Sequence, residues 1–428
     1  MIEKTKEKVN RAVLVGLDAF SLDREENATE SSMEELAALL ETAGGECMSV
    51  VMQSKSSPDP RTFIGEGKVE EVKQLVQAVG ADMVIFDNAL SPSQQRVLSE
   101  ELKVAVMDRS ALILDIFAQR ARTREGRLQV ELAQYQYLLP RLIGMWTHLE
   151  RQEGAIGTRG PGETQLETDR RHIRRKISKL KEELEDVRRI RATQRVRREK
   201  NEVPVVAIVG YTNAGKSTLL NKLTGSDIPA NNRLFDTLDT TTRTLEISDT
   251  CTVLLSDTVG FISKLPHHLV EAFKATLEEL SFADLLLHVI DASNPEWREQ
   301  AQVVDQLIMD LGAQETPRIE VFNKCDCWTG EIRPHGEDIV SISAKTGEGL
   351  DKLLEAIGKR LDNGAKRVTI HLPYDKGGLL ERLHQEAKVE KVDYSETIDV
   401  VAVCTPKMIG QLGAFVEGWK PSKEPWEE

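Results

Sequence analysis

The fold is decided by the stretch Gly210-Tyr211-Thr212-Asn213-Ala214-Gly215-Lys216-Ser217, which joins the apolar run Val205–Val209 to an apolar helical pattern. The pattern G-x-x-x-x-G-K-S between a strand and a helix is typical of a phosphate-binding loop. Its glycines let backbone N–H groups surround a β-phosphate, and the start of the helix adds positive potential. We expect the whole loop to contact the nucleotide, with Lys216 at the β- and γ-phosphates and Ser217 at Mg²⁺.

A second motif, Asp257-Thr258-Val259-Gly260, follows the apolar run Val253–Ser256. We expect this run to be the strand beside the phosphate-loop strand, which brings all four motif residues to the nucleotide. The Asp257 carboxylate is then the second group that holds Mg²⁺, acting through a water molecule. Because the N–H of Gly260 is expected to sense the γ-phosphate, Lys216 and Gly260 are candidate catalytic residues.

The base is predicted by Asn323-Lys324-Cys325-Asp326, which follows the strand-like run Ile319–Phe322. The Asp326 carboxylate can accept two hydrogen bonds from guanine, at N1–H and N2–H₂, and adenine offers neither donor. Leaving that carboxylate unpaired predicts a preference for GTP over ATP on the order of 10⁴. We expect Asn323 to bond the base and the phosphate loop, and the stem of Lys324 to cover the ring.

A fourth motif, Ser343-Ala344-Lys345, follows the strand-like run Ile339–Ile342, and its backbone is expected to contact guanine O6. Together the four motifs predict a Mg²⁺-dependent domain that takes GTP as substrate and releases GDP. Between the first two motifs lies Asn231–Arg243, a polar loop rich in threonine. A threonine there is expected to sense the γ-phosphate and bind Mg²⁺. The residues alone leave four candidates, which are Thr237, Thr240, Thr241 and Thr242.

Phe261 directly follows Gly260, at the position where small signalling GTPases carry a glutamine that orients the attacking water. A phenyl ring cannot orient water by hydrogen bonding. The sequence therefore predicts slow intrinsic hydrolysis and a large partner that supplies the missing group.

Charge is unevenly spread along the 428 residues. The formal net charge of −14 argues against nucleic acid as a partner, and we expect no DNA binding. Arg170–Lys200, however, holds 14 lysines or arginines against 5 acidic residues. A basic segment on an acidic protein predicts a directed contact with RNA phosphates, and the alternative is a solvated helix face.

Cysteine use and hydropathy give further expectations. Five scattered cysteines (Cys47, Cys251, Cys325, Cys327 and Cys404) indicate reduced thiols rather than a disulfide framework or a zinc site. The charged N-terminus is not a signal peptide, and no apolar run is long enough to span a membrane. We expect a cytoplasmic, monomeric protein.

Two segments in the middle of the chain have heptad spacing of apolar residues. The first set is Leu128, Leu132, Tyr135, Leu139, Leu142 and Trp146, and the second is Ile173, Ile177, Leu180, Leu184 and Val187. Such helices predict an antiparallel hairpin, with a kink at Pro140. The Gly-rich segment Gly154–Thr164 is expected to be a non-helical tip. It is not a second nucleotide site by motif, because no Lys-Ser follows its last glycine; whether ATP binds elsewhere in the N-terminal region stays open.

Strand-like and helix-like runs alternate on both sides of this hairpin. The N-terminal strands are expected at Ala12–Gly16, Met48–Met52, Met83–Phe86 and Val104–Met107, with helices at Ser31–Thr42, Gly67–Val79 and Ser91–Leu102. The C-terminal strands are expected at Val368–Leu372 and Thr397–Cys404, with helices at Gly378–Ala387 and Lys407–Trp419. We expect an α/β protein with an N-terminal α/β domain (1–120), a helical hairpin (121–202), a P-loop GTPase domain (203–363) and a small α+β appendage (364–428).

Several blocks resemble one family. Residues 120–171 contain RARTREGRLQVELAQ, YLLPRL and GTRGPGETQLETDRR, and with FDTLDTTTR and DTVGFI they resemble HflX-type GTPases. The resemblance runs from about residue 12 to residue 361, and more loosely to the C-terminus. It implies a translation-factor-related GTPase that binds the large ribosomal subunit and splits or recycles stalled ribosomes under stress. The basic hairpin would then reach ribosomal RNA, with Arg159 and Arg170–Arg198 at phosphates.

The resemblance also implies that Thr237 is the switch threonine, a Mg²⁺ ligand and a catalytic residue. It lies in Phe235-Asp236-Thr237-Leu238-Asp239, a segment expected to contact the nucleotide. Family members usually show alanine before this threonine and proline where Thr240 stands, so Thr240 remains the alternative sensor. Two other hypotheses compete with the ribosomal one: a GTP-dependent RNA-binding or signalling switch without a ribosome-splitting role, and a scaffold with a vestigial site. The presence of Lys216, Ser217, Asp257 and Asp326 disfavours the last.

Overall fold

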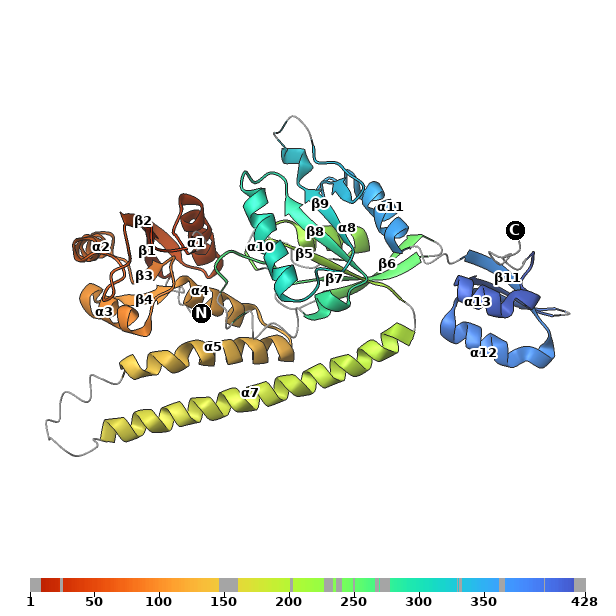
Figure 1. Ribbon diagram of the computed structural model, residues 1–428, viewed down its shortest axis with the longest axis horizontal. Helices are drawn as coiled ribbons and strands as arrows, with labels where there is room; N and C mark the ends of the chain where they lie inside the picture. The colour runs from red at the N-terminus through yellow and green to blue at the C-terminus, as the bar shows by residue number, and fades with distance from the viewer. Residues whose placement is uncertain are drawn as a thin grey trace, which may run out of the picture.

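The protein was analysed as a computed structural model, which describes residues 9–23, 26–145, 161–200, 203–226, 234–235, 241–248, 251–265, 269, 278–328, 330, 333–361, 366–395 and 397–418. Figure 1 shows three sheets following one another along the long axis, with a pair of antiparallel helices running beneath the first two. The mixed α/β fold class predicted from the sequence is confirmed.

The N-terminal sheet is parallel, with strand order β2-β1-β3-β4. Its elements are β1 (Arg11–Ala19), α1 (Glu30–Thr42), β2 (Glu46–Lys55), α2 (Glu66–Val79), β3 (Met83–Phe86), α3 (Pro92–Leu102), β4 (Ala105–Asp108) and α4 (Arg109–Arg120). Successive side chains of β1 enter two different cores. Ala12 and Leu14 pack on the side of α1 and α4, whereas Val13 and Val15 pack on the side of α2 and α3.

Helix α4 differs from the expectation, which placed no helix after Val104–Met107. Strand β4 passes directly into it, because Asp108 is both the last strand residue and the N-cap. The Asp108 carboxylate accepts a hydrogen bond from the N–H of Ala111 at 2.9 Å, as a capping aspartate does. With no turn residues between strand and helix, the sequence carries no boundary signal.

The predicted antiparallel helix pair is present as α5 (Arg124–Met145) and α7 (Pro161–Lys200) (Figure 1). The seam residues buried together are Leu128, Leu132, Leu180 and Leu184. Pairing of Glu125 with Arg191 at 2.6 Å, and of Glu131 with Lys176 at 3.5 Å, shows that the helices run in opposite directions.

Two details of the hairpin can be compared with the expectation. Helix α5 continues through Pro140, and Trp146 lies outside the described residues. The non-helical tip is wrong for residues 161–164, because α7 begins at Pro161; residues 154–160 lie outside the described residues. Proline suits a first helical position, where its fixed φ fits and its missing N–H has no partner to lose.

The P-loop sheet has the order β10-β9-β8-β5-β7-β6 and is parallel except for β6, which is antiparallel to β7. Its strands are β5 (Val205–Gly210), β6 (Thr241–Ser248), β7 (Cys251–Asp257), β8 (Leu285–Asp291), β9 (Arg318–Asn323) and β10 (Ile339–Ser341). Helices α8 (Lys216–Thr224) and α11 (Leu350–Leu361) cover one face, and α10 (Trp297–Asp310) covers the other. The short 3₁₀ turns η1 (Glu278–Phe282) and η2 (Cys325–Cys327) complete this part.

One apolar core is continuous between the N-terminal sheet and the P-loop sheet. It joins Leu112, Ile116 and Phe117 from α4 to Phe235 and Phe261 from the loops of the P-loop sheet. These two parts are therefore packed against each other at the edge where the nucleotide motifs lie.

The C-terminal part is a three-stranded antiparallel sheet of order β11-β13-β12 with helices on one face. Its elements are β11 (Lys366–Leu372), η3 (Tyr374–Lys376), α12 (Gly377–Glu386), β12 (Lys388–Tyr394), β13 (Ile398–Cys404), α13 (Pro406–Leu412) and η4 (Gly413–Phe415). Strand β12 was not predicted, because its polar sequence KVEKVDY turns only Val389 and Val392 toward the core. The last predicted helix is too long, since α13 ends at Leu412.

The five cysteines are thiols without a disulfide, as predicted. Among the described helices, none is both long enough and apolar enough to cross a membrane.

Candidate functional site

The phosphate loop lies where β5 ends and α8 begins, at the carboxyl edge of the parallel strands. Lys216 is buried, and its Nζ donates to the carbonyl oxygens of Gly210 at 3.0 Å and Tyr211 at 2.8 Å. Burial lowers the pKa of Lys216 to about 8, although nearby Asp257 acts in the opposite direction. The ammonium group is thus held across the loop and has lost most of its hydration.

Gly215 shows why this loop requires glycine. Its φ is +95°, and an added Cβ would lie 2.2 Å from the amide nitrogen of Asn323. Asn213 has a φ of 60°, a left-handed conformation that asparagine tolerates better than most residues. The loop backbone is therefore fixed in an arrangement that few other sequences adopt.

The predicted Mg²⁺ ligands meet directly. The Ser217 hydroxyl donates to Asp257 Oδ2 at 2.8 Å, and Asp257 is fully buried at the end of β7. A hydroxyl and a buried carboxylate are oxygen donors that suit Mg²⁺, which usually takes one or two protein groups and fills its shell with phosphate and water. The residues present therefore fit the ion that the motifs imply.

The base-recognition motif is tied to the phosphate loop by Asn323. Its Nδ2 donates to the carbonyl of Ala214 at 2.8 Å, and its Oδ1 accepts from the N–H of Ala344 at 2.9 Å. Asn323 is buried, so these bonds are shielded from water. One side chain thereby sets the spacing of the three loops that would surround a nucleotide.

Asp326 is exposed at the rim, and a hydrogen bond from the Ser343 side chain is the main cause that lowers its pKa. The carboxylate therefore stays ionised at neutral pH, as the role predicted for it requires. Lys324 adopts a left-handed φ of 63°, and its Nζ pairs with Asp291 at 2.7 Å. This ion pair fixes the direction of the stem that is expected to cover the base.

Two residues that sequence reasoning missed support the base loops. One is Asp291, the partner of Lys324. The other is Arg333, which donates to Glu348 Oε1 at 2.6 Å and to the carbonyl of Cys325 at 3.2 Å. The N–H of Ser343 donates in turn to the Glu348 carbonyl at 2.9 Å. Neither residue belongs to a motif, and both act through tertiary contacts that spacing cannot reveal.

The threonine-rich loop is described only in part. Phe235 is buried, its ring meets Phe117 edge-to-face at 4.7 Å, and its N–H donates to the Thr212 hydroxyl at 3.0 Å. Asp236, Thr237, Leu238, Asp239 and Thr240 lie outside the described residues. Thr241 and Thr242 are in β6, where Thr241 is opposite Asp257 and the Thr242 hydroxyl lies 3.4 Å from that of Ser256.

The segment after Asp257 lies on the phosphate loop itself. Thr258 donates to the carbonyl of Ile208 at 2.7 Å, and Val259 is buried. The backbone of Phe261 bridges that of Tyr211, with Thr212 N–H donating to Phe261 O at 2.6 Å. The Phe261 ring is buried in the core shared with α4, so it packs as an apolar anchor at the position where small signalling GTPases carry a glutamine.

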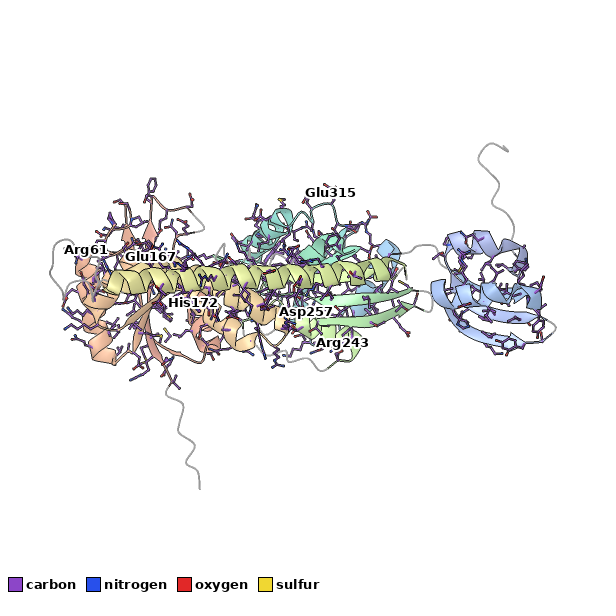
Figure 2. All side chains as sticks on the ribbon, turned by 90° about the horizontal axis from the view of Figure 1, so that it is seen from below. Arg61, Glu167, His172, Arg243, Asp257 and Glu315 are labelled. Atoms are coloured by element: carbon purple, nitrogen blue, oxygen red, sulfur yellow. The ribbon has the colours of Figure 1, made fainter. Side chains whose placement is uncertain are left out.

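A separate surface is formed by α7, which crosses the face shown in Figure 2 with Glu167 and His172 near its beginning. Its exposed cations with no ion pair inside the described part of the chain are Arg171, Arg174, Arg175 and Lys181. Arg188 and Arg189, by contrast, pair along the helix with Glu185 at 3.4 Å and Asp186 at 2.9 Å.

Comparisons with known proteins identify the family of the chain. The chain matches four family descriptions in succession: "GTP-binding GTPase N-terminal" over 30–118, "GTP-binding GTPase Middle Region" over 120–198, "50S ribosome-binding GTPase" over 205–324 and "HflX C-terminal domain" over 332–404. A solved structure of a GTP-binding protein from Sulfolobus solfataricus, in complex with GDP, is 25% identical with a TM-score of 0.44, covering 82% of this chain and 99% of that one.

Curated relatives span nearly the whole chain. A GTPase HflX of Caldanaerobacter subterraneus subsp. tengcongensis is 49% identical over 97% of this chain and 96% of its own. A GTPase HflX of Escherichia coli (strain K12) is 45% identical over 89% of this chain and 90% of its own. The protein is therefore a GTP-hydrolysing enzyme, and the chain belongs to the GTPase HflX family.

Proposed function

We propose that this GTPase binds the large ribosomal subunit through the basic face of α7, and that it splits or recycles stalled ribosomes under stress. The observation that carries the proposal is the set of exposed cations on α7 that no acidic residue of the described chain neutralises. The description "50S ribosome-binding GTPase", which the P-loop part matches, supports the same partner. The protein acts as a cytoplasmic monomer in this proposal.

Ribosomal RNA suits this surface physically. Arg171, Arg174 and Arg175 occupy successive turns near the beginning of α7, and the seam residue Ile173 between them is buried. Cations that project from a rigid, supported helix can meet several phosphates at once, and each contact releases counterions. Ion pairs within the protein would have to be broken first, and these arginines have none to break among the described residues.

Hydrolysis follows from the roles proposed for the site residues. Lys216 binds the β- and γ-phosphates, Ser217 and Asp257 hold Mg²⁺, and the N–H of Gly260 meets the γ-phosphate. Mg²⁺, when bound, neutralises charge that develops on the phosphate oxygens. Phe261 cannot orient the attacking water, because its phenyl ring has no hydrogen-bonding group and is buried in the shared core. We therefore expect slow turnover until the ribosomal subunit completes the site.

Cosedimentation with separated ribosomal subunits, in the presence of a non-hydrolysable GTP analogue, tests the partner. Binding to the large subunit alone is expected, together with GTP hydrolysis accelerated about 10²-fold or more by that subunit. Lys216→Ala should abolish both the basal and the stimulated rate. Equal binding to unrelated RNA without stimulation would instead favour an RNA-binding switch, and fast hydrolysis without any partner would contradict the role given to Phe261.

Splitting requires its own measurement. Light scattering of intact ribosomes should fall when the protein and GTP are added together, and sedimentation should show the two subunits apart. Binding without a change in scattering would support the ribosome as the partner but contradict the splitting role.

A further inference from the structure

Tyr211, the second residue of the phosphate loop, joins three parts of the molecule through its hydroxyl group. The hydroxyl donates to Glu35 Oε1 on α1 at 2.5 Å and accepts from the N–H of Ser263 at 2.7 Å. The Ser263 hydroxyl donates to the other oxygen of Glu35 at 2.8 Å. Glu35, Tyr211 and Ser263 thus form a closed triangle, which we call the Glu35 triangle.

Buried charges hold the Glu35 triangle in place from the N-terminal side. Arg109, only 2% exposed, pairs with Glu35 and with Asp87 Oδ1, the latter at 2.7 Å. Lys264, the residue after Ser263, pairs with Asp87 and donates to the carbonyl of Asn27 at 2.8 Å. Residues 263 and 264 are therefore fastened to the N-terminal sheet by buried groups, whose loss of a partner is strongly unfavourable.

The fastened segment begins three residues after Gly260, whose backbone lies close to Lys216. A Cβ on Gly260 would be 3.1 Å from Lys216 Nζ and 3.0 Å from the Cα of Thr212. Lys216 is expected to bind both the β- and γ-phosphates, but only the γ-phosphate is expected to meet the N–H of Gly260. A γ-phosphate oxygen bonded to Nζ at about 2.8 Å would therefore approach from the side of Gly260. With the γ-phosphate in that position, the Gly260–Phe261 backbone would have to withdraw to admit GTP, whereas GDP, which lacks this phosphate, would not require the movement.

We propose that Glu35 and Tyr211 are positioning residues that hold the segment after Gly260 against the phosphate loop and so make the protein favour GDP over GTP. The established GTPase activity needs no such contact, and the ribosomal partner is not assumed. By linkage, any macromolecule that moves α1 away from Ser263 would raise the affinity for GTP without touching the nucleotide.

The test compares full-length variants by the ratio of two dissociation constants, for GDP and for a non-hydrolysable GTP analogue. Tyr211→Phe keeps the ring and removes the oxygen that joins the triangle, so the analogue should gain about tenfold relative to GDP. Glu35→Gln should move the ratio in the same direction by less, because an amide oxygen still accepts from Tyr211. Ser263→Ala removes the hydroxyl that donates to Glu35 and should shift the ratio in the same direction. It provides an independent test if Tyr211→Phe does not fold.

Ser31→Ala is the matched control. Ser31 also joins the two parts, through an exposed hydrogen bond to Glu296, and it is not a member of the Glu35 triangle. Its ratio should equal that of the unaltered protein. A positioning role is supported if the triangle variants shift the ratio of the two dissociation constants, because a general loss of stability would weaken the binding of both nucleotides and leave the ratio unchanged. A ratio that is unchanged, or that moves toward GDP, would overturn the proposal, since a merely structural contact weakens both nucleotides alike.

Discussion

The nucleotide loops and the exposed face of α7 both recognise phosphates in our account, but they are built in opposite ways. In the loops the three central polar side chains already have protein partners: Lys216 bonds carbonyls, Ser217 bonds Asp257, and Asn323 bonds two loops. On α7, Arg174 and Arg175 are exposed, with no ion pair among the described residues. Bonds within the protein fix the geometry of the loops, which therefore select one ligand. Exposed charges without such bonds attract any polyanion, and this attraction weakens as the salt concentration rises.

The largest effect should come from the loops. Asp326→Asn removes an acceptor of two guanine hydrogen bonds, so the preference for GTP over ATP should fall by about 10⁴, and xanthosine triphosphate should become the better ligand. Titration of the full-length protein with each nucleotide measures this. Asp351→Asn, an exposed acidic residue in the first turn of α11, is the control and should change nothing. Equal losses for all nucleotides would show that Asp326 does not read the base.

A smaller, salt-dependent effect should come from α7. Replacing Arg171, Arg174 and Arg175 with Gln should lower the salt slope of log affinity for the large subunit by about three, roughly one for each phosphate contact. The pair Arg188 and Arg189, already bound to acidic neighbours, should change the slope less when replaced in the same way. Cosedimentation at several salt concentrations separates the two variants, and GTP affinity should stay constant in both. If the triple variant had the same salt slope as the unaltered protein, the exposed cations of α7 would be interpreted as an ordinary solvated helix face.

This contrast also explains what the sequence could reveal. Lys216, Asp257 and Asp326 could be placed on adjacent loops because each has a chemical role at a fixed distance along the chain. Arg333 and Glu35 could not, since their partners are chosen by the packing of distant elements. Helix α4 could not be predicted either, because Asp108 ends a strand and caps a helix with no turn residues between them. For Thr237 the structure adds nothing, so its assignment still rests on family resemblance.

A smaller loss of nucleotide affinity is expected when Arg333, which supports the predicted base loops, is replaced. Arg333→Gln removes its ion pair with Glu348 and weakens its hold on the Cys325 carbonyl, so GDP and GTP should both bind about fivefold more weakly. Faster release of a fluorescent GDP in a stopped-flow experiment would show this directly. Arg360→Gln breaks a comparable surface pair, with Asp338, far from the loops and serves as the control. A change confined to GTP would argue against a role in holding the base.

The smallest effect concerns a proton. Burial lowers the pKa of Lys216 to about 8, so near pH 8 about half of the molecules carry a neutral amine before nucleotide binds. Phosphate oxygens beside Nζ favour the charged form, which raises this pKa again and makes binding take up about half a proton. GTP affinity should therefore fall as pH rises above 8 and be level below pH 7. Calorimetry at pH 8 in two buffers of different ionisation enthalpy measures the uptake, and Lys216→Arg, which stays charged, should show none. Identical heats in the two buffers would mean that the bonds to Gly210 and Tyr211 keep the ammonium charged. Lys216 would then already be protonated, as well as correctly placed, before the phosphates bind.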